Sequence, residues 1–146
     1  MVQPIPEGYR TVTPYLIVTD PAALVGFLER AFDAVETERT TAPDGRVMHA
    51  AVRVGDSMLM MGGANERYPP RPGTVYLYVP DVDATYERAT AAGGTSLMEP
   101  ADQFYGDRNG GVEDPWGNQW WIGTHVEDVP PAELERRHRE AKGHTG

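Results

Sequence analysis

The feature of this sequence that most constrains its fold is an internal duplication. Two stretches, YLIVTDPAALVGFLERAF from Tyr15 and YLYVPDVDATYERATAAG from Tyr76, each read as an apolar strand, an aspartate and a helix. Asp20 and Asp81 are suited to begin the helices, because an aspartate side chain accepts hydrogen bonds from the free N–H groups of a first helical turn. They lie 61 residues apart (81 − 20). A repeat at this period predicts two similar structural units in one chain.

The second half of each unit repeats as well. RVMHAAVRVGDSMLMMG and NGGVEDPWGNQWWIGTH both read as strand, turn and strand, with the turn glycines at Gly55 and Gly117. The period of these glycines is 62 residues (117 − 55), close to that of the aspartates. The sequence therefore predicts an α+β fold of two tandem units, each ordered as strand, helix and two or three strands. The first helix is indicated by apolar residues at helical spacing, namely Leu24, Phe27, Leu28 and Phe32.

Proline, glycine and charge mark the boundaries between these units. The tail opens at Pro130 and Pro131 and carries Leu134 as its only large apolar residue, so we expect a solvated or partner-docked helix outside the core. The predicted parts are a first unit at 1–61 with an N-terminal arm at 1–9, a Pro/Gly-rich linker at 62–73, a second unit at 74–128, and a polar C-terminal helix and tail at 129–146.

Composition excludes several classes of partner. The net charge of −9 argues against nucleic acid and anionic membranes, which reward lysine and arginine, and it favours cationic or neutral ligands. The chain has no cysteine, which excludes disulfides and thiol catalysis and fits a cytoplasmic location. The first residues do not resemble a signal peptide, and no apolar run is long enough to span a membrane.

Two adjacent tryptophans follow the turn EDPWGNQWW. Strand residues alternate between faces, so Trp120 and Trp121 should point in opposite directions. One of them can fill a core, which leaves the other on the opposite face of a sheet. Glu113 and Asp114 flank the turn, where an aspartate before proline is ordinary turn chemistry.

These features together resemble the vicinal oxygen chelate superfamily, also called glyoxalase/bleomycin resistance/dioxygenase, over about Tyr9 to Asp128. DPWGNQW is similar to the Asp-Pro-x-Gly turn of the family, and QFYGDR at 103–108 with THVEDV is similar to its PhnB-like branch. The resemblance implies paired βαβββ modules that form a cupped mixed sheet around a central cavity. It also implies a homodimer, either simple or with swapped modules, and pairing of this kind would cover the exposed sheet edges.

The resemblance also locates the metal ligands of the family's metal enzymes, one on the first and one on the last strand of each module. Divalent metals prefer histidine nitrogen, carboxylate oxygen or, for some, thiolate, and the residues of this chain do not offer them. We therefore expect no metal and no other cofactor, with Trp121 facing the cavity and Trp120 packed toward the helices. The corresponding positions are Thr13, Met60 (Leu59 in the alternative register), Thr74 and Trp121.

Aromatic residues and methionines share the strand parity of these positions. Such side chains form a deformable apolar surface suited to planar ligands, although a small cup could also be filled by its own side chains. Phe104 or Tyr105 could reach into the mouth of the pocket, whereas Asp107 and Arg108 are interpreted as an ion pair that orders their loop. The predicted ligand-binding residues are Thr13, Tyr15, His49, Met60, Thr74, Tyr76, Tyr78, Phe104, Tyr105 and Trp121.

His49 is the only histidine inside the predicted sheet, and its role stays open between a general base or ligand partner and an ordinary strand residue. Surface roles are expected for His125, His138 and His144. No residue is assigned as catalytic.

We expect a metal-independent protein that binds a small planar or cationic molecule, with antibiotic sequestration as the suggested role. The alternatives are a metal-free enzyme that uses His49, a dimeric scaffold with a vestigial cup, and a metal-dependent lyase, isomerase or dioxygenase.

Overall fold

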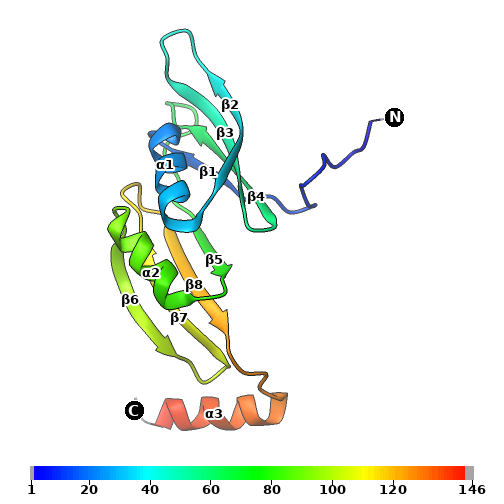
Figure 1. The fold of residues 1–146 in the computed structure, drawn as a ribbon, viewed down its shortest axis with the longest axis vertical. Helices are drawn as coiled ribbons and strands as arrows, with labels where there is room; N and C mark the ends of the chain where they lie inside the picture. The colour runs from blue at the N-terminus through cyan, green and yellow to red at the C-terminus, as the bar shows by residue number, and fades with distance from the viewer. Residues whose placement is uncertain (1, 144–146) are drawn as a thin grey trace.

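The computed structural model describes residues 2–143, which form two βαβββ modules followed by a C-terminal helix (Figure 1). The predicted α+β fold of two tandem modules is confirmed. The elements are β1 (Tyr15–Val18), α1 (Pro21–Phe32), β2 (Val35–Thr41), β3 (Val47–Val54), β4 (Ser57–Gly63), β5 (Thr74–Tyr78), α2 (Val82–Ala91), β6 (Thr95–Asp102), β7 (Asp107–Glu113), β8 (Gln119–His125) and α3 (Pro131–Gly143).

Each module forms its own four-stranded mixed sheet, in the orders β1-β4-β3-β2 and β5-β8-β7-β6. The first strand of each module runs parallel to the last, and the other pairs are antiparallel. The registers repeat, because Tyr15 lies beside Met60 and Tyr76 lies beside Trp121, each 45 residues apart (60 − 15 and 121 − 76). The sequence duplication is therefore a duplication of strand register, and β1 and β5 lie at equivalent edges of their sheets.

Local side-chain chemistry begins and ends the helices as the sequence suggests. Asp20 accepts a hydrogen bond from the Ala23 N–H at 3.1 Å, and Asp81 does the same for Ala84 at 3.1 Å. Asp33 ends α1 in the left-handed region at φ 56°, which a side chain other than glycine adopts at a cost. Its carboxylate is held by Arg88 of α2 at 2.6 Å, so the end of α1 is tied to the second module.

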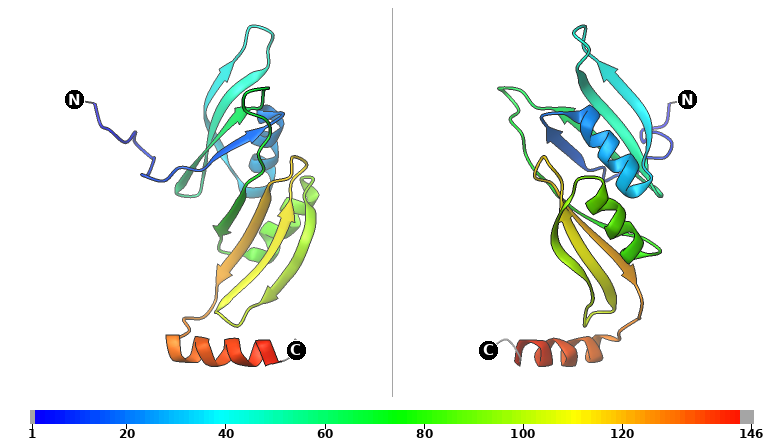
Figure 2. Two further views of the ribbon diagram at one scale, coloured as in Figure 1. Left: turned by 180° about the vertical axis from the view of Figure 1, so that it is seen from behind. Right: turned by 60° about the vertical axis from the view of Figure 1, so that its left-hand side comes forward.

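A single apolar core joins the two modules. The helices α1 and α2 lie side by side on the same side of the two sheets (Figure 2). Phe32 of α1 contacts Trp120 of β8 with ring centroids 5.6 Å apart, and Phe27 meets Trp116 edge-on at 6.4 Å. Because these rings come from both halves of the chain, the modules are fixed to one another by the same burial that stabilises each of them.

The turn before β8 sets the orientation of the tryptophan pair. Asp114 accepts the backbone N–H groups of Trp116 and Asn118, the side-chain amide of Asn118 and the indole N–H of Trp120, all at 2.9 Å. Trp120 is fully buried on the helix side, and Trp121 lies on the opposite face of the strand, as predicted. Asp114 is thus the hub of a buried turn, which goes beyond the ordinary turn role expected from the sequence.

The two ends of the described chain lie outside this core. Residues 2–12 form an arm that extends away from the first module and is exposed along almost its whole length (Figures 1 and 2). The predicted linker begins later than expected, since β4 continues through Gly63. The helix α3 covers most of the predicted tail, and residues 144–146 of that tail lie outside the described residues. None of the helices in the described chain is long and apolar enough to cross a membrane.

Candidate binding site on the open sheet faces

Most of the predicted ligand-binding residues lie on the two sheet faces that point away from the helices, here called the open faces. On the first open face, Tyr15 and Met60 are neighbours in register, and His49 lies beside Gly62 on the adjoining strand. The rings of Tyr15 and His49 are 5.8 Å apart. Thr13 precedes β1, and its hydroxyl donates to the Arg10 carbonyl at 3.1 Å. The first open face therefore presents a tyrosine, a histidine and a thioether.

The second open face carries a larger set. Parity and register place Tyr76 beside Trp121 and Tyr78 beside Gly123. The adjoining pairs of β7 and β8 place Asp107 beside His125 on the same face. The residues of β5, β7 and β8 that share this face are Thr74, Tyr76, Tyr78, Asp107, Asn109, Gly111, Glu113, Gln119, Trp121, Gly123 and His125.

Glycines allow the aromatic rings to lie flat on these faces. Tyr15 crosses Gly62 and Tyr76 crosses Gly123, at positions related by the internal repeat. The indole of Trp121 lies over Gly111, where an added Cβ would come within 2.6 Å of the ring. A methyl group at Gly123 would collide with the hydroxyl of Tyr76. Because glycine has no side chain, each ring can lie across the neighbouring strand and present its face outward.

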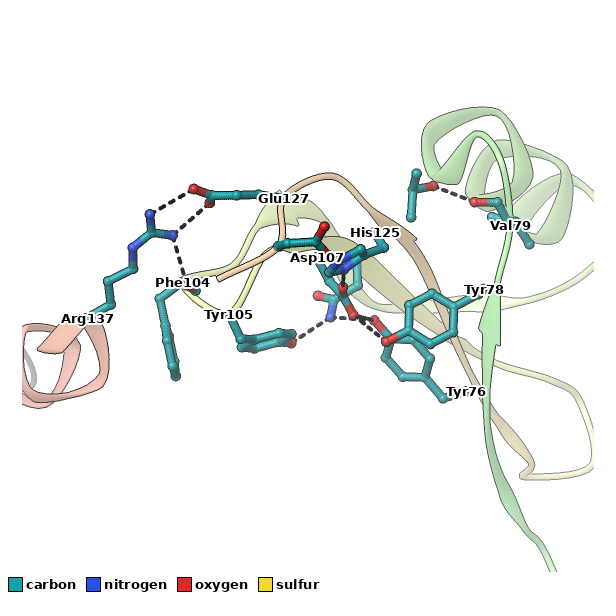
Figure 3. A network of polar contacts seen from close by, with 12 residues as sticks. Tyr76, Tyr78, Val79, Phe104, Tyr105, Asp107, His125, Glu127 and Arg137 are labelled. Carbon is teal, nitrogen blue, oxygen red and sulfur yellow. Dashed lines mark hydrogen bonds and ion pairs between the residues drawn. The ribbon is translucent and has the colours of Figure 1, made fainter. Parts of the chain in front are cut away.

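Asp107 is the centre of a polar network on the second open face (Figure 3). One carboxylate oxygen accepts the hydroxyls of Tyr76 at 2.8 Å and Tyr78 at 2.9 Å. The other oxygen lies 2.9 Å from Nδ1 of His125, whose Nε2 lies 2.7 Å from the carboxylate of Asp128. Asp107 is 4% exposed, so its charge is held inside the sheet surface by three ring side chains.

Asn109 extends the network toward the turn between β6 and β7. Its side-chain N–H₂ donates to the hydroxyl oxygens of Tyr76 at 3.1 Å and Tyr105 at 2.6 Å. The hydrogen of the Tyr76 hydroxyl goes to Asp107, so that oxygen must accept, and this fixes the orientation of the Asn109 amide. Oδ1 of Asn109 is then a buried acceptor that has no donor within residues 2–143.

The network shifts the pKa values of its members in opposite directions. Burial raises the pKa of Asp107, but hydrogen bonds from His125, Tyr76 and Tyr78 outweigh this and hold it below its usual value. Burial and the neighbouring carboxylate raise the pKa of Tyr76 to about 12. Hydrogen bonds to Asp107 and then to Asp128 raise the pKa of His125. The network therefore favours the anionic form of Asp107 and shifts His125 toward its protonated, cationic form.

Phe104 and Tyr105 point in different directions although they are adjacent (Figure 3). Tyr105 reaches Asn109 and so joins the second open face. Phe104 stacks on His138 of α3 with ring centroids 5.4 Å apart, and its carbonyl accepts from Arg137 at 3.2 Å. Phe104 therefore anchors the C-terminal helix.

The ion pair expected between Asp107 and Arg108 is wrong. Adjacent strand residues point to opposite faces, so the two side chains cannot meet. Arg108 instead binds Asp83 of α2 at 2.9 Å and Asp102 at 3.4 Å on the helix side. His125 was expected to have only a surface role, and its half-exposed side chain is in fact joined to the buried Asp107. The signal that could have revealed this is the parity of His125, which it shares with Trp121.

A cleft of about 740 Å³ lies between the modules of one chain. Tyr76 and Tyr78 line it from the second module, and Phe32 and Arg53 line it from the first. Its size falls in the range of small-molecule sites. Of the ten predicted ligand-binding residues, these two tyrosines are the ones that line it. Tyr15, His49, Met60 and Trp121 are not among the residues that line this cleft.

The donor set does not fit a divalent metal. The positions that hold metal in the family's enzymes carry hydroxyl, thioether and indole groups here, at Thr13, Met60, Thr74 and Trp121. Residues 2–143 contain no group of three or more His, Cys, Asp or Glu side chains arranged to hold a metal ion.

The fold and these residues agree with a known family. The model of the Glyoxalase/Bleomycin resistance protein/Dioxygenase superfamily matches residues 10–122. The chain belongs to this superfamily. Its resemblance to the vicinal oxygen chelate proteins is thereby confirmed at the level of the superfamily.

Relatives in mycobacteria and solved structures agree with this assignment. Uncharacterized protein Rv0887c of Mycobacterium tuberculosis (strain H37Rv) is 38% identical over 135 residues, covering 85% of this chain and 79% of that protein. Uncharacterized protein Mb0911c of Mycobacterium bovis has the same identity, with 89% of its length covered. The crystal structure of TioX from Micromonospora sp. ML1 has a TM-score of 0.70 and 28% identity, over 80% of this chain and 99% of that one. A superfamily enzyme from Burkholderia phytofirmans PsJN has a TM-score of 0.66 at 20% identity, over 78% and 97% of the two chains, and shows the shared fold.

Proposed function

We propose that this superfamily member is a metal-independent protein that binds a small planar molecule on its aromatic open faces. The observation that carries the proposal is the exposure of the aromatic rings. The exposed rings are those of Tyr15, Tyr76 and Tyr78, and glycines of the neighbouring strands lie beneath Tyr15 and Tyr76. These rings are close to the positions that carry the metal ligands in the family's metal enzymes. Exposed rings held flat on a rigid sheet favour stacking with another planar group, since little motion is lost on binding.

Antibiotic sequestration is the role we favour within this proposal. The superfamily takes part of its name from bleomycin resistance proteins. The acidic net charge of −9 would attract a cationic drug, and the sequence marks at 103–108 suggest the PhnB-like branch. We place the protein in the cytoplasm.

We further propose that the chain acts as a homodimer in which the partner covers the exposed sheet edges. The edge strands β1 and β5 and the exposed tyrosines leave large apolar surface uncovered in one chain. The arm at 2–12 lies away from its own module and could reach a second copy. Neither nucleic acid nor a membrane surface is proposed as a partner.

The oligomeric state is tested by light scattering at micromolar concentration. We expect the mass of two chains, and we expect a variant lacking residues 2–8 to shift toward the monomer because it loses the arm. A full-length protein that is monomeric at this concentration would contradict the proposed dimer and leave the binding proposal standing.

Ligand binding is tested by calorimetry against a panel of planar antibiotics, both cationic and neutral. We expect at least one compound to bind with micromolar affinity, and we expect Tyr78→Ala to weaken it about tenfold by removing an exposed ring. Tyr68→Ala is the matched control, because Tyr68 is similarly exposed but contacts Arg67 in the linker instead of the open faces. Absence of binding across the panel would overturn the proposed function.

A further inference from the structure

We propose that the rings of Tyr76 and Tyr78 bind the positively charged group of the ligand. The negative charge of Asp107 attracts this group, and the positive charge of a protonated His125 opposes that attraction. This inference rests on the proposed function and names its ligand class, a planar ring system that bears a protonated amine. It assigns the recognition of charge to the second open face alone.

The two tyrosine rings have the arrangement of an aromatic cation site. Their centroids are 5.0 Å apart with the rings inclined at 54°, and Tyr78 is 67% exposed. Both hydroxyls donate to the same oxygen of Asp107. A phenol that donates to a carboxylate gains negative charge in its ring, and a cation is attracted to the face of such a ring. Since Asp107 is buried, an incoming cation meets the rings first and the carboxylate acts through them.

The size of the neighbouring cleft fits such a ligand. Tyr76 and Tyr78 form one wall of the 740 Å³ cleft between the modules. The charged residues of its lining are Asp33, Arg53, Asp56 and Arg88, two of each sign, so their formal charges balance. The sign of the potential at the tyrosines is therefore set by the Asp107 network.

His125 controls how much of the Asp107 charge a ligand would experience. The groups that face its ring are Asp107 on β7 and Asp128 after β8, with Tyr76 and Tyr78 beyond Asp107 on β5. Tyr105 approaches from the turn before β7 through Asn109. The nearby Arg137 of α3 is neutralised by its ion pair with Glu127 at 2.8 Å. With His125 protonated, the group of Asp107, His125 and Asp128 carries a net charge of −1, and with His125 neutral it carries −2 and attracts a cation more strongly.

The amide of Asn109 is a second, independent indication of the ligand's chemistry. Its Oδ1 is a buried acceptor without a donor among the described residues, on the same amide whose N–H₂ group donates to the Tyr76 and Tyr105 hydroxyls. Buried acceptors are usually satisfied, and an N–H group is the donor that fits an amide oxygen. A protonated amine supplies both this N–H and the positive charge.

The test compares two probes that share one ring system. 9-Aminoacridine is a planar cation with N–H donors, and acridine is its uncharged counterpart above the pH at which it takes up a proton. Affinities are measured by fluorescence from about pH 6.5, the ordinary pKa of a histidine, upward into the alkaline range, because the pKa of His125 lies above its ordinary value. We expect 9-aminoacridine to bind roughly fivefold more tightly at the upper end, while acridine is unaffected.

Two variants locate the effect. His125→Asn keeps a donor for Asp107 but does not titrate, so we expect the pH dependence to disappear and the high affinity to be present throughout. Asp107→Asn should weaken 9-aminoacridine by about tenfold and leave acridine within about twofold. Asp83→Asn removes the same charge on the helix side, where it faces Arg108, and should change neither probe.

The outcomes separate this inference from the proposed function. Binding of both probes with no pH dependence, or a pH dependence that survives in His125→Asn, would overturn the inference and leave small-molecule binding intact. Failure of both probes together with the antibiotic panel would overturn the proposed function, and the inference with it.

Discussion

Asp114→Ala is expected to destabilise the protein by about 3–5 kcal/mol, a large effect for one side chain outside the apolar core. The carboxylate accepts four hydrogen bonds, from Trp116, from the backbone and side chain of Asn118, and from the indole of Trp120. Alanine would leave these donors without an acceptor in a buried turn, which costs more than the hydrogen bonds contribute. Denaturant unfolding followed by tryptophan fluorescence measures the loss.

Two control variants separate the turn network from a general effect of charge. Glu113→Ala removes the neighbouring carboxylate, which is not part of this network, and should cost less than about 1 kcal/mol. Trp120→Phe removes a single donor and part of the ring, and should cost an intermediate amount. If Asp114→Ala were no worse than Glu113→Ala, Asp114 would not be the hub that the hydrogen bonds indicate.

Gly123→Ala is expected to weaken binding of the planar ligand at least about tenfold, with a change of stability of only about 1 kcal/mol. The new methyl group would occupy the place of the Tyr76 ring. The ring is the end of a flexible side chain and can rotate away at little cost. It would then lose its bonds to Asp107 and Asn109, and the aromatic surface would be broken. Calorimetry and thermal unfolding of the same samples measure the two effects.

Two further glycine variants serve as comparisons. Gly63→Ala adds the same group on β4, where the nearest atom lies 3.5 Å away, and should leave binding unchanged. Gly62→Ala displaces Tyr15 from the equivalent position of the first module. Binding that is lost with Gly62→Ala but retained with Gly123→Ala would move the site to the first open face.

The duplicated modules could be predicted because their signals are local. Asp20 and Asp81 cap helices through their own sequence neighbours, and the parity of Trp120 and Trp121 follows from strand geometry. The candidate site was only partly predictable. The alternation of side chains along a strand places Tyr76, Tyr78 and Trp121 on one face. It does not tell which residue of a neighbouring strand lies beside each of them.

The Asp107 network was missed for that reason. Asp107 meets His125 because of the register of β7 on β8, and this register is set by the loop that contains Asp114. The sequence offers Arg108 as the obvious partner, since it is adjacent and oppositely charged. The extended backbone turns the two side chains apart, so the nearest charge in sequence is on the wrong side of the sheet. The role of Phe104 was missed for a similar reason. Its partner His138 comes from a helix whose position the sequence did not specify.

The ring contacts of Phe32 with Trp120 and of Phe27 with Trp116 have a consequence for how the molecule unfolds. Neither half retains a complete interior when the other is removed, so each excised half would be an unstable polypeptide despite its regular architecture. Melting should therefore occur as one cooperative event.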